Sequence, residues 1–320
     1  MRVCFRIVCA ALLTLTFSLS PMFVSPSSAA ATSAGDILVA DPGSGTIHHY
    51  SASGVDLGVF AGGLSSPSWI TADRIGNIYV SEHDGQRISK FSPAGLNPLL
   101  LTITTPYKPG GVQVGTDGTI YVADYSGGQV YRYSAIGEDL GPFASAVLPQ
   151  AEFMAFDAGG NLYVTNSLLD VVRRVSPTGV ELGDFVAGFP GPAGIAFDAD
   201  GNLYVASSNS NFIQKYSPSG ADLGEFAFMD LSNEMKGIAF DASGNLYVAN
   251  FAKGNIQKFS PAGDDLGVFA SAGLVAPWDL VIVPVGVAPT VKEECKQGGW
   301  LSFNVFKNQG DCIQLLNTGK

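Results

Sequence analysis

Six oxygen-bearing side chains recur along the chain at intervals of 41 to 43 residues. They are Asp41, Glu82, Asp124, Asn166, Ser207 and Asn250. Hard cations such as Ca²⁺ take oxygen ligands of these types. If folding brings the six positions to one ring, Asp41, Glu82, Asp124, Asn166 and Asn250 form a candidate divalent-cation site. The alternative is that each Asp or Asn closes a local turn through its own side chain.

A second set of positions changes its chemistry from one interval to the next. It comprises Ser68, Gly110, Glu152, Ala193, Lys236 and Trp278, with Trp69 and Asp279 one residue further on. Within this set, the candidate ligand-binding residues are Trp69, Glu152, Lys236, Trp278 and Asp279. Aromatic surface beside charges of both signs suits a small polar ligand or a peptide. The alternatives are simple drift in loop sequence, or tryptophans that fill the interior as core.

Other catalytic signatures are missing from the sequence. It contains neither a Gly-x-Ser-x-Gly nucleophile elbow nor a phosphate-binding P-loop. Of the three histidines, His48 and His49 are adjacent in an expected strand, so their side chains should face opposite ways, and His83 stands in a loop. We therefore expect no three-histidine zinc site.

The recurring positions follow an internal repeat. The phrase Gly-Asn-Leu-Tyr-Val-Ala recurs with small changes, starting at Gly35, Gly76, Gly118, Gly160, Gly201 and Gly244. A period in the low forties with short apolar runs indicates a β-propeller. With 46% apolar residues, the chain can bury a sizeable core.

Each repeat reads as four strands. In the unit around Gly201 we expect strands at 194–198, 202–206, 212–216 and 222–227, separated by glycine-containing turns. Both faces of these strands are apolar, as required when a blade is packed between two neighbours. The sequence therefore predicts an all-β fold, a six-bladed propeller of four-stranded antiparallel blades. Residues 279–283 should pair with residues 36–40 and close the ring.

The phrases Gly-Ile-Ala-Phe-Asp-Ala-Asp-Gly-Asn-Leu-Tyr-Val-Ala and Ile-Gln-Lys-Tyr-Ser-Pro-Ser-Gly resemble the NHL repeat over about residues 35–285. They are more loosely similar to the gluconolactonase and regucalcin group. That second resemblance implies a divalent cation held at the channel by a Glu, Asn and Asp set. Glu152, Asn166 and either Asp279 or Asp41 could imitate such a set, although no motif around them matches it.

The two ends of the chain lie outside the repeat. Arg2 and Arg6, an apolar stretch and small residues at 28–30 predict a cleavable secretory signal over residues 1–30, with a membrane anchor as the alternative. Without it, the chain has 15 basic and 28 acidic residues, a net charge of −13. That charge argues against nucleic acid and anionic membranes as partners. We expect a secreted, extracellular or cell-envelope protein without a stable membrane span after cleavage.

Two cysteines remain after the signal, Cys295 and Cys312, and in an exported chain they are expected to form a disulfide. Zinc ligation is the alternative. Residues 286–294 read as a linker, and residues 295–320 form a tail. The tail resembles a short C-terminal segment of assorted secreted bacterial proteins, and the resemblance implies export.

These observations predict a secreted, monomeric, non-catalytic binding propeller. Its ligand or partner site would lie at one mouth of the axial channel and take a small polar ligand, a peptide or an extracellular protein. The alternative function is a metal-dependent hydrolase or lactonase resembling gluconolactonases. In that case the cofactor would be Ca²⁺ or another divalent cation.

Overall fold

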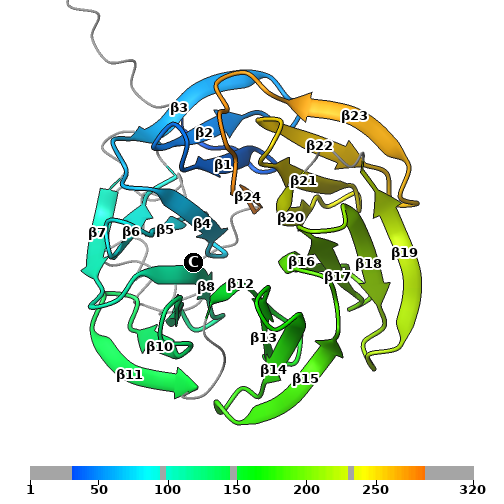
Figure 1. Cartoon of the computed structure of the whole chain (residues 1–320). Coiled ribbons are helices and arrows are strands. Elements are labelled where there is room, and N and C mark those ends of the chain that lie inside the picture. The colour runs from blue at the N-terminus through cyan, green and yellow to red at the C-terminus, as the bar shows by residue number, and fades with distance from the viewer. Residues whose placement is uncertain (1–30, 94–98, 145–149, 230–233, 285–320) are drawn as a thin grey trace, which may run out of the picture.

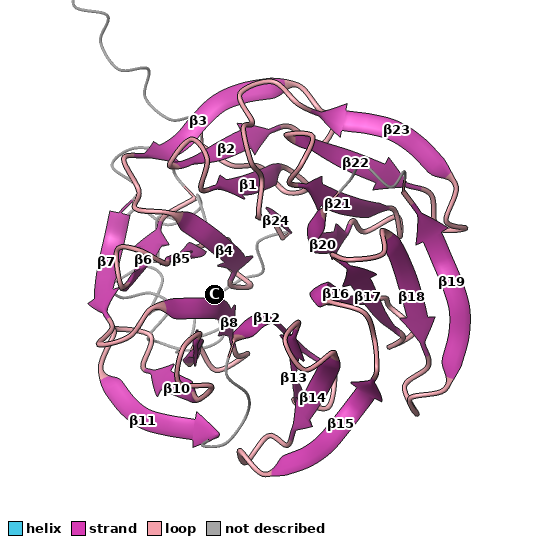
Figure 2. Cartoon of the chain, in the orientation of Figure 1, coloured by secondary structure: helices cyan, strands magenta, loops and turns pink. Residues whose placement is uncertain are grey.

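The computed structural model describes residues 31–93, 99–144, 150–229 and 234–284, in which every regular element is a β-strand (Figure 2). The strands form six four-stranded antiparallel sheets around a central axis (Figure 1). The predicted six-bladed propeller is therefore confirmed. No helix in this part of the chain is long and apolar enough to cross a membrane. The expected signal, the linker and the tail with Cys295 and Cys312 lie outside the described residues.

The two inner strands of each blade are short and largely buried. The innermost strands are β4 (Pro67–Ala72), β8 (Pro109–Val114), β12 (Ala151–Phe156), β16 (Pro192–Phe197), β20 (Met235–Phe240) and β24 (Asp279–Ile282). The second strands carry the repeated Leu-Tyr-Val phrase and are β1 (Ile37–Asp41), β5 (Ile78–Glu82), β9 (Ile120–Asp124), β13 (Leu162–Asn166), β17 (Leu203–Ser207) and β21 (Leu246–Asn250). Burial on both faces explains their continuous apolar sequence.

The two outer strands become progressively more exposed. The third strands are β2 (Thr46–Tyr50), β6 (Arg87–Phe91), β10 (Val130–Tyr133), β14 (Val171–Val175), β18 (Phe212–Tyr216) and β22 (Asn255–Phe259). The fourth strands form the rim and are β3 (Asp56–Gly62), β7 (Leu99–Thr104), β11 (Asp139–Ala144), β15 (Glu181–Ala187), β19 (Asp222–Phe228) and β23 (Asp265–Ala270). In the unit around Gly201, the observed strand limits differ from the expected ones by at most two residues.

The ring closes through its two ends, as predicted. The C-terminal strand β24 pairs antiparallel with β1, and Ile37 lies opposite Ile282 while Ala40 lies opposite Asp279. The amide of Trp278 donates to the carbonyl of Ala40 at 2.9 Å, which extends the pairing by one residue. One blade is thus built from both ends of the repeat region, and no inner strand is left unpaired.

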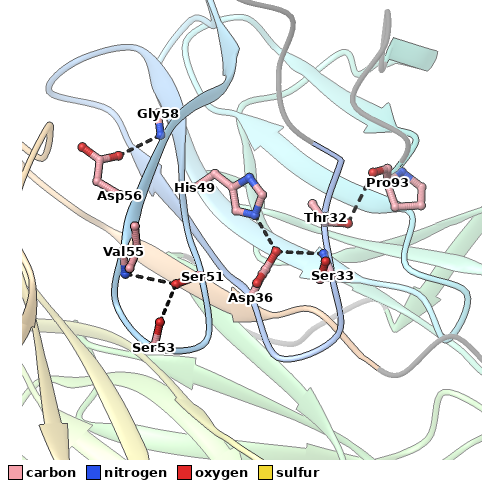
Figure 3. Close-up of polar contacts among 10 residues, drawn as sticks. All are labelled: Thr32, Ser33, Asp36, His49, Ser51, Ser53, Val55, Asp56, Gly58 and Pro93. Carbon is pink, nitrogen blue, oxygen red and sulfur yellow. Dashed lines mark hydrogen bonds and ion pairs between the residues drawn. The ribbon is translucent and has the colours of Figure 1, made fainter.

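Polar contacts hold the segment before β1 against this closing blade (Figure 3). The carboxylate of Asp36 accepts a hydrogen bond from the amide of Ser33 and lies 2.8 Å from Nε2 of buried His49. Thr32 donates its amide to the carbonyl of Pro93 in the neighbouring blade. His48 contacts Asp56 instead, so the two adjacent histidines do face opposite ways.

The repeated Asp, Asn and Tyr residues form a local network at the hairpin between the first and second strands. Asp198 accepts hydrogen bonds from the Asn202 amide at 2.8 Å and from the Tyr204 hydroxyl at 3.1 Å. The Tyr204 ring lies 4.9 Å from Phe226 of its own blade and 4.8 Å from Phe240 of the next blade. The segment from Asp198 to Asn202 is therefore a turn. The recurring tyrosine packs between neighbouring blades.

The innermost strands crowd together at the axis, where glycine is required. A Cβ atom at Gly194 would collide with the carbonyl oxygen of Lys236 on the neighbouring strand, and one at Gly237 would collide with the Asp279 carboxylate. The start of each of these strands lies opposite the end of a second strand, as Pro109 lies opposite Asp124. The two variable sets of positions therefore meet at the same end of the channel, which we call the mouth.

Candidate functional site

Most of the candidate cation ligands accept hydrogen bonds from backbone amides. Asp124 accepts from the amides two and three residues further on, at 3.0 and 2.8 Å. Asn166 and Asn250 each accept from the amide three residues on, at 2.7 and 3.3 Å. Asp41 accepts from Ala276 at 3.0 Å, which ties β1 to the loop before β24. These contacts are those expected of side chains that close turns.

Among the candidate cation ligands, Glu82 accepts the most hydrogen bonds. Arg87 reaches both of its carboxylate oxygens, at 2.7 and 2.6 Å, and Ser89 and the amide of Ser65 also donate to it. Burial acts to raise the pKa of Glu82, but these hydrogen bonds and the Arg87 charge hold it below its usual value. The carboxylate is thus ionised and already neutralised by a protein cation.

The described residues contain no group of three or more His, Cys, Asp or Glu side chains placed to hold a metal ion. A gluconolactonase-like set formed by Glu152, Asn166 and either Asp279 or Asp41 stays a prediction. The backbone contacts of the candidate cation ligands support the turn-closing alternative. Binding of Ca²⁺ at Asp41, Glu82, Asp124, Asn166 and Asn250 stays a prediction.

Aromatic rings from different blades meet at the mouth. The Trp69 ring lies 5.8 Å from that of Trp278, in a T-shaped arrangement, and 5.9 Å from that of His83. The Tyr125 ring is 5.0 Å from His83, and the Phe251 ring is 5.6 Å from Trp278. Edge-to-face packing of this kind holds such rings in fixed relative positions.

These five rings line a pocket of about 360 Å³, together with small residues such as Pro42 and Ser68. We call it the aromatic pocket. None of the described residues that line it carries a carboxylate or an ammonium group. Its size and apolar walls are those of a small-ligand or peptide-anchor site.

Two of the remaining candidate ligand-binding residues, Lys236 and Glu152, lie near this pocket without lining it. The Lys236 ammonium lies 4.4 Å from the centre of the Trp278 ring and 2.8 Å from a carboxylate oxygen of Glu234. Glu152 is buried, and its Oε1 accepts from the Ser167 hydroxyl at 2.7 Å. Burial raises the pKa of Glu152, against the opposing effects of that hydrogen bond and the Lys236 charge.

Asp279 lies below the mouth, on β24. It lines a second cavity, of about 370 Å³, enclosed by the six innermost strands along the axis. Its Oδ2 accepts from the amide of Ile70 in the neighbouring blade at 3.1 Å, and its Oδ1 accepts from the following amide, Leu280, at 2.9 Å. Burial nevertheless raises the pKa of Asp279 to about 8. Trp69 also contributes to this cavity, so it separates the channel from the aromatic pocket.

Sequence reasoning missed His83, Tyr125 and Phe251 as pocket residues. Each directly follows one of the recurring oxygen-bearing positions, and the equivalent residues in the other repeats are Pro42, Ser167 and Ser208. The residue type at this position varies between repeats as strongly as it does in the set that contains Trp278. That set was chosen because its residues vary at equivalent places, and the same criterion would have identified His83, Tyr125 and Phe251. His83 is fixed by a contact of 3.0 Å between its Nδ1 and the carbonyl of Pro109.

The chain is thus a six-bladed β-propeller with an aromatic pocket at one mouth. No protein-family model matches the sequence, and no curated protein matches it. A structure of a nidogen/laminin complex is similar, with a TM-score of 0.70 and 16% identity over 79% of this chain and 99% of that chain.

Two enzyme structures share the architecture. A putative gluconolactonase has a TM-score of 0.59 and 16% identity, covering 71% of this chain and 88% of that one. Virginiamycin B lyase from Staphylococcus aureus has a TM-score of 0.57 and 18% identity, covering 72% and 79%. At these identities the similarity shows the fold alone. The resemblance to gluconolactonase-like propellers is confirmed at that level.

Proposed function

We propose that this chain is a non-catalytic binding propeller whose ligand or partner inserts an apolar group into the aromatic pocket. The observation that carries the proposal is the pocket itself, in which rings from four blades enclose about 360 Å³. Aromatic side chains contribute large contact areas at low entropic cost, and they dominate the energetics of binding sites. An exported location, inferred from residues 1–30, would expose this mouth to extracellular ligands or proteins.

The polar groups around the pocket support binding over hydrolysis. Glu152 is hydrogen-bonded to Ser167, Lys236 is paired with Glu234, and Glu82 is neutralised by Arg87. A general base or a metal ligand needs a free lone pair directed at the substrate. The metal-dependent hydrolase or lactonase alternative has in its favour the shared fold and the carboxyl of Glu152, of which, among the described residues, only Oε1 is hydrogen-bonded.

A ligand-observed NMR screen tests the proposal. The panel would contain phenol, N-acetylproline amide, glucose and acetate, which represent aromatic, amide, polyol and anionic chemistry. We expect saturable binding of at least one apolar or amide fragment, and its loss in Trp278→Ala and Phe251→Ala. Leu223→Ala, on the exposed rim strand β19, is the matched control because it removes apolar surface far from the mouth.

Thermal unfolding of each variant shows whether the fold is intact. Binding that survives both mouth substitutions, in variants that unfold like the native chain, would refute the pocket as the site. So would a complete absence of binding across the panel.

A further inference from the structure

Two residues that line the aromatic pocket carry buried hydrogen-bond donors that lack acceptors. The indole nitrogens Nε1 of Trp69 and Trp278 are buried and have no partner among the described residues. No other buried side-chain nitrogen or oxygen of the pocket lining is unpaired in this way. The unmet hydrogen-bonding capacity of the buried lining atoms therefore consists of donors, and a ligand that offers acceptors would relieve it.

We infer that the ligand of this pocket is a proline-rich peptide segment in the polyproline II conformation, an inference that rests on the proposed function. Proline has no backbone N–H, so such a segment presents apolar ring faces and carbonyl acceptors but few donors. In the polyproline II helix these carbonyls make no internal hydrogen bonds. Aromatic-lined grooves bind this kind of peptide because its conformation is already formed before binding.

Other ligand classes fit the surroundings less well. A cation would be repelled by the Lys236 ammonium, which already occupies the face of the Trp278 ring at 4.4 Å. A carboxylate would approach the buried acidic side chain of Glu152, while the Lys236 ammonium is already paired with Glu234. A sugar brings about as many donors as acceptors, whereas the buried unpaired atoms here are donors only.

Binding must rearrange the two indoles. Neither Nε1 atom has exposed surface, and Trp69 as a whole is only 3% exposed. A peptide carbonyl can reach these atoms only if the T-shaped pair, with ring centres 5.8 Å apart, moves apart. The environment of both tryptophans would then change, so intrinsic fluorescence reports the event directly.

The experiment is a fluorescence titration with a decaproline peptide. It uses the full chain with Trp300→Phe, because the sequence has three tryptophans and this substitution leaves only the two reporters. We expect a saturable change with decaproline and none with a (Gly-Ser)₅ peptide of equal length. Trp278→Phe keeps the aromatic ring but removes the N–H, and it should weaken binding about tenfold. Leu223→Ala should leave the titration unchanged.

The outcomes separate the two proposals. If fragments bind in the NMR screen but decaproline does not, the ligand class is wrong and the proposed function stands. If decaproline binds with equal affinity to native and Trp278→Phe protein, the donor argument fails. If neither fragments nor decaproline bind, both proposals fail.

Discussion

The carboxyl of Asp279 makes folding stability depend on pH in a direction that can be tested. It sits on the closing strand β24 and holds β24 to β4 through the amide of Ile70. Burial raises its pKa to about 8, so the folded protein keeps this carboxyl protonated at neutral pH. The unfolded chain releases the proton near the ordinary value of about 4.

The sign follows from proton linkage. Between about pH 4 and pH 8 the folded state binds one more proton than the unfolded state, so the free energy of unfolding falls as pH rises. The limit is about 1.4 kcal/mol per pH unit, or at most about 5 kcal/mol over the window. Because Asp279 as a residue is only partly buried, we expect solvent to reduce the total to about 2–3 kcal/mol.

The perturbation is Asp279→Asn, which removes the titration. The amide nitrogen cannot accept one of the two backbone hydrogen bonds, so we expect a loss of about 1 kcal/mol at pH 5. At pH 9 the variant should be the more stable protein, because it has no charge to bury. Urea unfolding between pH 5 and pH 9 measures the free energy of unfolding of both proteins as a function of pH. The two curves should cross.

Other titrating groups, such as Glu152, are present in both the native and the Asp279→Asn protein. Their contributions to the pH dependence therefore cancel in the difference between the two curves. Asp200→Asn, on an exposed hairpin turn, is the matched control and should run parallel to the native chain. Parallel curves for native and Asp279→Asn protein would refute proton retention at Asp279.

Two further substitutions test closure and packing between blades. Leu280→Ala, at a side chain 3% exposed on the closing strand, should cost about 2–5 kcal/mol, whereas Leu266→Ala, 55% exposed on the rim, should cost under about 0.5 kcal/mol. Equal costs in urea unfolding would contradict the closure argument. Tyr204→Phe should lose about 0.5–1.5 kcal/mol with its hydrogen bond to Asp198, and Tyr204→Ala about 3–5 kcal/mol with its packing. Equal losses for the two would mean that the ring contributes nothing between Phe226 and Phe240.

The fold could be predicted closely because four of the six repeats carry the same set of turn residues. Asp198, Gly201, Asn202 and Tyr204 each recur, and in the structure they satisfy one another at a single hairpin. Strand limits such as those of β18 followed directly from the turns on either side. Pairing of β24 with β1 followed from counting strand types, since the repeat region begins with a second strand and ends with a lone first strand.

The site could be predicted only in part. Trp69 and Trp278 do line a pocket, because both stand where an innermost strand begins. Glu152 and Lys236 stand at the same position but pair with Ser167 and Glu234 in their own surroundings. Equivalence in the repeat fixes the backbone position of a residue. It does not fix the conformation or the partners of its side chain, because these depend on neighbouring loops with unrelated sequences.

The asymmetry of the mouth is the strongest reason to assign function there. Six equivalent positions would give a symmetric ring if only the scaffold mattered, and the Asp, Asn and Tyr network at the opposite hairpins shows that regularity. At the mouth, aromatic residues gather on four blades, whereas the position equivalent to Trp278 on the fifth blade is the buried Ala193. A one-sided aromatic wall instead provides one defined orientation for an asymmetric ligand such as a peptide segment.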